Sequence, residues 1–255
     1  YRRDLSKFEA YFKAVDEALD FTHVDADIVR RWVMSQMDEG LTATTVNRML
    51  SSLRSFYRYL LSRGKILADP MVKVKGPKKK KPLPVFVKEA DMDKILDGDG
   101  FQRNFEGMRD RVIVEMFYET GLRRSELTGL KDADVDFSAR QVKVLGKRNK
   151  HRIVPFGEEL ERDLQAYLSE RDSLFASCDA FFVNKKGEPL ADGAVYRIVK
   201  RVLSGVVTLK KRSPHVLRHT FATSMLNHRA ELEAVKELLG HKSLMTTEVY
   251  THTTF

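Results

Sequence analysis

Two segments of the chain place arginine beside a carboxylate or an imidazole at spacings that suit chemistry on a phosphodiester. Arg123 comes directly after a glycine turn at Gly121-Leu122, and Glu126 lies three residues later on the same face of an expected helix. His215 and Arg218 are also three residues apart, so they again share one helical face. Guanidinium groups stay charged and can hold two oxygens at once, which suits the extra negative charge of a pentacoordinate phosphorus. These segments therefore indicate a phosphoryl-transfer site.

Two further side chains of chemical interest lie near the end of the chain. His241 follows a helix end expected at Leu239-Gly240, and Tyr250 comes nine residues later. A single arginine, histidine or tyrosine of this kind is more often a surface or core residue, so only the combination of segments points to a site. The sequence has no His/Cys/Asp cluster with metal-ligand spacing and no GxxxxGK[ST] loop. We therefore expect chemistry that needs no cofactor, neither metal nor ATP.

Most of the elements that must position these residues are expected to be helices. Apolar residues recur at three- and four-residue steps. They predict helices over 110–119, 125–130, 158–171, 195–203, 217–227 and 232–239. Val142 and Val144 instead alternate with polar residues, residues 146–150 have turn composition, and Ile153 resumes the apolar run, which predicts a β-hairpin. Lys147 would lie at the tip of that hairpin.

The first third of the chain forms a separate helical domain by the same criteria. Helical periodicity covers residues 5–15 and 28–37, and a longer apolar face runs from Thr42 to Arg63. Prolines and a run of four lysines then replace the apolar pattern, which is typical of a stiff linker. The predicted division is a helical domain over 1–75, a linker over 76–84 and a larger domain over 85–255. The whole is mainly α, with a small antiparallel sheet in the larger domain.

The distribution of charge favours a polyanionic partner. The net charge is +9, and residues 1–87 carry 17 Lys and Arg against 10 Asp and Glu. An excess concentrated in one domain fits a module that grips DNA, although a solvated lysine-rich surface would look the same. The candidate DNA contacts are Arg48, Arg54, Arg58, Lys78, Lys79, Lys80, Lys81 and Arg124. Arg124 is either such a contact or merely exposed.

The composition argues against several other classes of protein. The single cysteine, Cys178, rules out an intramolecular disulfide framework and a Cys-rich zinc site, and we interpret it as a packing residue. No apolar run approaches the roughly 20 residues that a membrane-spanning helix needs. We therefore expect a soluble, cytoplasmic protein without a membrane partner.

Taken together and in this order, the motifs resemble those of the tyrosine recombinase, or phage integrase, family. The segments TGLRRSEL, GKRNKHRIVPF, SPHVLRHTFATSML and LLGHKSLMTTEVYTH look most like its bacterial Xer branch, and the resemblance covers nearly the whole chain. The family pattern is Arg, hairpin Lys, His-x-x-Arg, His or Trp, and Tyr. Its positions are filled by Arg123, Lys147, His215, Arg218, His241 and Tyr250. The resemblance implies a SAM-like helical core-binding domain followed by an α+β tyrosine recombinase catalytic domain.

The resemblance also implies roles for these residues. Tyr250 would attack phosphorus and form a 3′-phosphotyrosyl bond; because a free tyrosine has a pKa near 10, a base must help, and His215 is the leading candidate. Arg123 and Arg218 would hold the non-bridging oxygens, and His241 would donate a further hydrogen bond to the same phosphate.

Lys147 is the remaining catalytic residue of the family pattern, Glu126 is an auxiliary residue, and His219 is an adjacent histidine. Lys147 would protonate the departing 5′-oxygen as general acid; Lys150 is a nearby competitor, and Lys147 is preferred because it matches the family position. Glu126 would orient Arg123, with a helix-surface carboxylate as the alternative. His219, beside Arg218, is more often a structural histidine in such a position than a catalyst.

The resemblance implies a double-stranded DNA recombination site as substrate. A homo- or hetero-tetramer would act on two sites through a Holliday junction, and a partner recombinase or a DNA translocase stays open as a further partner. Within the family, Xer-type resolution of chromosome dimers is favoured over a phage or mobile-element integrase. A type IB topoisomerase shares the nucleophile chemistry but needs no paired sites. A non-catalytic architectural DNA-binding protein would not need all of the catalytic positions.

Overall fold

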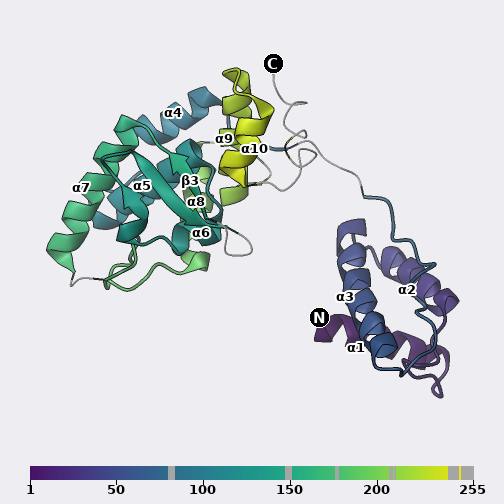
Figure 1. The fold of residues 1–255 in the computed structure, drawn as a ribbon. Helices are drawn as coiled ribbons and strands as arrows, with labels where there is room; N and C mark the ends of the chain where they lie inside the picture. Colours follow the sequence, from purple (N-terminus) through teal and green to yellow (C-terminus); the bar gives the residue numbers. More distant parts are fainter. Residues whose placement is uncertain are drawn as a thin grey trace. The chain divides into compact units, whose positions relative to one another are not determined.

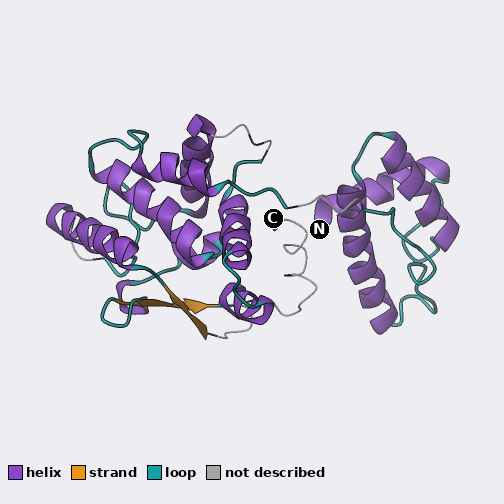
Figure 2. Ribbon diagram, turned by 90° about the horizontal axis from the view of Figure 1, so that it is seen from above, coloured by secondary structure: helices purple, strands orange, loops and turns teal. Residues whose placement is uncertain are grey.

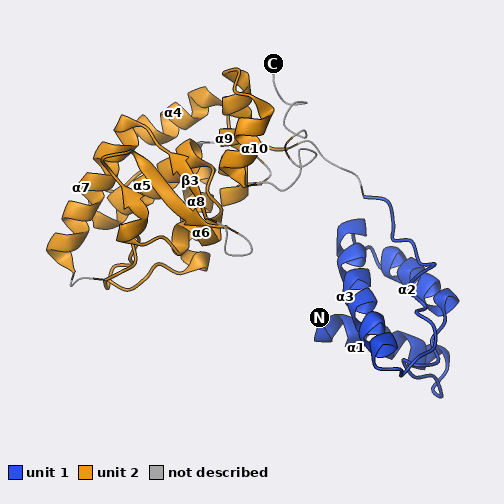
Figure 3. Ribbon diagram, in the orientation of Figure 1, with its two compact units in different colours: residues 1–82 blue, residues 83–255 orange. Residues whose placement is uncertain are grey.

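The computed structural model describes residues 1–79, 84–146, 151–175, 178–206, 209, 211–240 and 247 (Figure 1). The chain divides into two compact units, Tyr1–Pro82 (unit 1) and Leu83–Phe255 (unit 2), as Figure 3 shows. Each unit has a hydrophobic core of its own. The sequence predicts a helical domain over 1–75, a linker over 76–84 and a larger domain over 85–255, and these limits remain predictions.

Unit 1 is built from the helices α1 (Arg2–Val15), α2 (Ala26–Asp38) and α3 (Ala43–Ser62). Side chains cap the starts of α2 and α3, and the cap of α3 is the threonine that the sequence predicts. The Asp25 carboxylate accepts the backbone N–H groups of Asp27 and Ile28 at the start of α2, and Thr42 caps α3. The apolar faces meet in a core that includes the fully buried Phe8 and Trp32, whose ring centroids lie 4.9 Å apart. The predicted helices of this part are therefore confirmed.

Unit 2 is mainly helical. Its helices are α4 (Glu89–Asp97), α5 (Phe105–Thr120), α6 (Arg124–Thr128), α7 (Glu158–Leu174), α8 (Asp192–Val206), α9 (Pro214–Asn227) and α10 (Leu232–Leu239), with a 3₁₀ turn, η1, at Asp132–Asp134. Helix α5 is central and packs against α7, α8 and α9 (Figure 1). It begins five residues before the predicted start at Asp110, because Asn104 caps it by accepting the N–H of Gly107.

A small antiparallel sheet lies at one side of these helices (Figure 2). Strands β1 (Val135–Asp136), β2 (Gln141–Leu145) and β3 (His151–Pro155) pair in that order, with Val142 opposite Val154 and Val144 opposite Arg152. Alternate side chains of β2 point into the core, as the predicted hairpin requires. The two-residue β1 and the helix α4 were not predicted.

Candidate active site

The turn between α5 and α6 places Arg123. Helix α5 ends at Gly121, whose φ of 58° is left-handed, and a Cβ there would lie 2.4 Å from Cδ1 of Phe221. Arg123, two residues further on, is the N-cap residue of α6. Its backbone N–H donates to Glu126 Oε2 (2.8 Å) and its Nη1 donates to Glu126 Oε1 (2.7 Å). The arrangement holds the Arg123 guanidinium by a carboxylate on its own helix.

Helix α9 places His215 and Arg218. It begins at Pro214, which suits the first helical position because its missing N–H has no intrahelical partner there. Arg218 is 5 % exposed, and its Nη1 donates to the backbone oxygen of Gly121 (2.5 Å). Desolvation and the positive charges of Arg218, Arg124 and Arg123 lower the pKa of His215. The neutral imidazole, the form that can accept a proton, is therefore favoured at neutral pH.

The carboxyl end of α10 is bound by three guanidinium groups. Three successive backbone oxygens each accept a hydrogen bond, and the donors come from β3, α9 and the start of α6. The pairs are Arg152 Nε to Leu238 O (2.6 Å), Arg218 Nη2 to Leu239 O (2.5 Å) and Arg123 Nη2 to Gly240 O (3.0 Å). Cations are favoured at this end of a helix, where carbonyl groups lack intrahelical partners. The contacts bring Arg123 and Arg218 together at the helix that directly precedes His241.

Glu126 is the acidic centre of this cluster. Its side chain is only 4 % exposed, and besides Arg123 it binds Arg152 through two hydrogen bonds of 2.7 and 2.8 Å. Burial alone would raise its pKa, but the hydrogen bonds from Arg152 and from Arg123 outweigh that effect and lower the pKa to about 2. The carboxylate therefore stays ionised between two guanidinium groups.

The charge of Glu126 is expected to stabilise unit 2. Because its pKa falls from about 4.5 to about 2 on folding, the contribution is complete above pH 4.5 and is lost as the pH falls towards 2. Glu126→Gln should lower the free energy of unfolding by about 2–3 kcal/mol at pH 7. Urea unfolding followed by circular dichroism at pH 7, 5 and 3 should show the gap between variant and wild type shrinking at pH 3. The fluorescence of Trp32, which lies in unit 1, reports the unfolding of unit 1 and so distinguishes it from the unfolding of unit 2. A gap independent of pH would contradict the ionic role.

Several predicted site residues lie outside the described residues. They are Lys80, Lys81, Lys147, His241 and Tyr250, together with the competitor Lys150. Their roles remain predictions. Conversely, Arg152 is not among the site residues predicted from the sequence. An arginine at an inward-facing position of a strand, two residues before the buried Val154, is the signal that could have found it.

Two of the candidate DNA contacts in unit 1 have intramolecular partners. Arg48 forms two hydrogen bonds, of 2.6 and 2.8 Å, with the buried Asp4, and Arg54 Nη2 donates to the backbone oxygen of Val74 (3.0 Å). Arg58 is exposed. An arginine with some donors engaged can still meet a phosphate with the others, since the guanidinium carries five N–H groups.

The remaining described candidates are also near the surface or paired. Lys78 and Lys79 are exposed, and Arg124 pairs with Asp192 at 2.7 Å.

Desolvation, with the charges of His215 and Arg218 nearby, lowers the pKa of His219 to about 4. A neutral, partly buried His219 agrees with a structural histidine.

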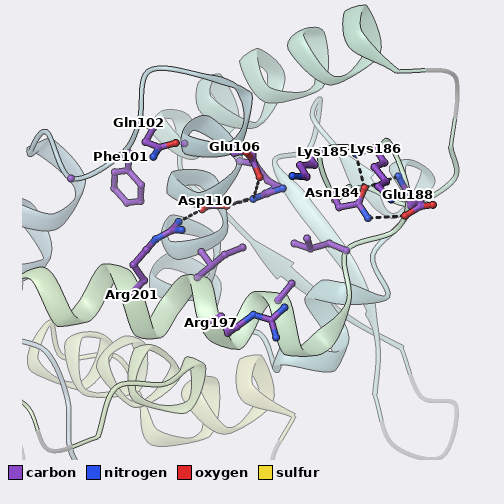
Figure 4. Close-up of a pocket in the computed structure, with 16 residues that line it drawn as sticks. Phe101, Gln102, Glu106, Asp110, Asn184, Lys185, Lys186, Glu188, Arg197 and Arg201 are labelled. Atoms are coloured by element: carbon purple, nitrogen blue, oxygen red, sulfur yellow. Dashed lines mark hydrogen bonds and ion pairs between the residues drawn. The ribbon is translucent and has the colours of Figure 1, made fainter.

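A separate hollow of about 830 Å³ lies in unit 2 between α5, α8 and residues 184–190 (Figure 4). Asp110, which also lines the hollow, accepts hydrogen bonds from Arg109 (2.7 and 2.9 Å) and pairs with Arg201. The carboxylate therefore neutralises part of the positive charge of the two arginines. Its lining shares no residue with the cluster at the end of α10. Within the described ranges no group of His, Cys, Asp and Glu could hold a metal ion, and no helix is long and apolar enough to cross a membrane.

Both units match known protein families. Residues 86–255 match the phage integrase family, and residues 1–64 match the N-terminal SAM-like domain of phage integrases. The tyrosine recombinase XerC of Chlorobaculum parvum is 39% identical over 282 residues, which cover 100% of this chain and 84% of that protein. XerC of Staphylococcus saprophyticus is 37% identical over 100% of this chain and 85% of its own length.

Solved structures agree with these relatives. The XerH recombinase bound to a palindromic difH substrate, in a post-cleavage complex, has a TM-score of 0.83 and 26% identity over 98% of this chain and 74% of that one. The XerA recombinase has a TM-score of 0.60 and 26% identity over 99% of this chain and 85% of that one. The family model covers more than half of the chain, and the relatives are similar along all of it. The chain therefore belongs to the phage integrase family and is a tyrosine recombinase of the Xer type.

Proposed function

We propose that this protein recombines DNA at specific sites by a tyrosine mechanism and resolves chromosome dimers. The observation that supports this most is the convergence of Arg123 and Arg218 on the end of α10, with a neutral His215 on the same helix as Arg218. Two fixed guanidinium groups suit a phosphate that gains negative charge in its transition state. A neutral imidazole suits the removal of a proton from a hydroxyl nucleophile.

The proposed reaction balances without an external energy source. The Tyr250 oxygen forms a bond to phosphorus as the bond to the 5′-oxygen breaks; His215 takes the phenolic proton and Lys147 gives a proton to the departing oxygen. Arg123, Arg218 and His241 hold the non-bridging oxygens. Because one diester bond replaces another, a 5′-hydroxyl can reseal the strand by the reverse path.

The proposed assembly is a tetramer, two protomers on each of two sites. The relatives named XerC and the XerH complex with a palindromic substrate support recombination between matched sites. Strand pairs would be exchanged one after the other through a Holliday junction, and the tetramer can contain one kind of chain or two. In a tetramer of two kinds of chain, a partner recombinase would carry out one of the two strand exchanges, whereas a DNA translocase would act as a regulator.

A plasmid assay tests this function. Duplexes that bind the protein are first selected from a random library, and two copies of the selected site are placed in direct repeat on a supercoiled plasmid. We expect two smaller circles, and no product when the sites are scrambled. Accumulated Holliday junctions would indicate a required partner recombinase. Relaxation without paired sites would favour a topoisomerase, and binding without any strand cleavage would favour an architectural protein.

A further inference from the structure

Arg152 lies at the junction of three elements of the candidate active site. It belongs to β3, opposite Val144 of β2, and its side chain is 12 % exposed. All three nitrogens of its guanidinium are engaged: Nη1 and Nη2 bind the two oxygens of Glu126, and Nε donates to the backbone oxygen of Leu238. One side chain thus connects the hairpin to α6 and to the end of α10.

The connection reaches Arg123 through a shared oxygen. Oε1 of Glu126 accepts from both Arg152 Nη1 and Arg123 Nη1, each at 2.7 Å. Without Arg152, the buried Glu126 carboxylate would lose two of its hydrogen bonds and would have to shift or take up a proton. Either response would alter the direction in which the Arg123 guanidinium is held.

The end of α10 fits closely around the same side chain. Gly240 has a left-handed φ of 61°, and a Cβ there would lie 3.3 Å from both Cδ and Nη1 of Arg152 and 3.5 Å from Nη1 of Arg123. A displacement of Arg152 is therefore transmitted to this helix end as well as to Glu126.

We propose that Arg152 is a positioning residue for strand cleavage, which holds Glu126 and the end of α10 so that Arg123 meets the scissile phosphate in the reactive orientation. The inference rests on the proposed function. It assigns no contact between Arg152 and DNA, so the residue should affect the rate of cleavage and not the affinity for the site.

Arg152→Lys tests the geometry because it keeps the charge and removes the planar fork. An ammonium group is a point donor and cannot bind both oxygens of Glu126 in parallel while also reaching Leu238. A misplacement of a catalytic group by about 1 Å can cost about 100-fold in rate. We expect single-turnover cleavage of a nicked suicide duplex to slow by about 10- to 100-fold at saturating protein. The Kd for the same duplex should change by less than about twofold, because no DNA contact is removed.

Arg171→Lys is the matched control. Arg171 is also in unit 2, its side chain is 6 % exposed, and it forks Asp132 with two bonds of 2.7 Å and donates to the Phe181 backbone oxygen. Both variants should lower Tm, since each removes hydrogen bonds that a buried guanidinium makes. Only the Arg152 variant should slow cleavage. If it fails to fold by circular dichroism, Arg152→Gln, which can still donate one hydrogen bond to Glu126, replaces it.

A double-mutant cycle identifies the path of the effect. If Arg152 acts through Glu126, the rates of Glu126→Gln, Arg152→Lys and the double variant should be clearly non-additive. The inference about Arg152 would be overturned if a folded Arg152→Lys protein cleaved at the wild-type rate, or if its cleavage were slowed no more than that of Arg171→Lys. Either result would leave the proposed function intact. Absence of any covalent complex with the wild-type protein would overturn the proposed function and this inference with it.

Discussion

Tyr250→Phe is expected to abolish the covalent protein–DNA complex. Phenylalanine keeps the ring but removes the oxygen that would attack phosphorus, so strand cleavage should fall by more than about 10⁴-fold, as when other enzymes lose their nucleophile. The measurement is a denaturing gel after incubation with a nicked suicide duplex carrying the selected site. Binding of that duplex, measured by gel shift, should be unchanged within about threefold, because most of the affinity comes from phosphate contacts.

Tyr118→Phe supplies the control for this change. Tyr118 is a half-buried residue of α5 in the same unit, and the variant likewise loses one hydroxyl group. It should form the covalent complex normally. A covalent band that persists in Tyr250→Phe would show that another residue is the nucleophile, and peptide mapping of the linked DNA would then identify it.

Arg123→Lys should reduce the rate of cleavage by about 10²–10³-fold, the loss typical of removing one fixed donor from a charged transition state. Lysine keeps the positive charge but cannot hold Glu126, the Gly240 oxygen and a phosphate oxygen in one plane, as a guanidinium can. The single-turnover rate at saturating protein measures the effect. The loss should appear in the rate of the chemical step and not in the Kd for DNA.

Arg140→Lys is the matched control for Arg123→Lys. Arg140, in the turn before β2, also pairs with a glutamate, Glu161, at 2.6 Å, and among the described residues its side chain forms no hydrogen bond or ion pair with Leu238, Leu239 or Gly240. Its cleavage rate should stay within about twofold of wild type, since exposed ion pairs contribute little. A wild-type rate in Arg123→Lys would show that charge alone, without the fork, is sufficient there.

The amphipathic periodicity of the chain determined where its longer helices lie. Residues 158–171, for example, became α7 (Glu158–Leu174), because side chains three and four residues apart share one face and must bury it together. Shorter or fully buried elements were less visible. Strand β1 has only two residues, and α5 is buried on most sides, so its sequence lacks the periodic polar face that marks an amphipathic helix. The family resemblance could likewise be recognised from the sequence alone, since it depends on short motifs and on their order along the chain.

Only the tertiary structure decided which charged groups meet. Arg123 and Gly240 are 117 residues apart, and Arg152 and Glu126 are 26 residues apart, so no spacing along the chain pairs them. Arg48 similarly binds Asp4 across 44 residues. Burial then sets the strength of each contact, because a carboxylate removed from water must be satisfied by donors that the fold brings to it. The residue types of the candidate site were therefore determined by the sequence, whereas the network that orients Arg123 was decided by packing.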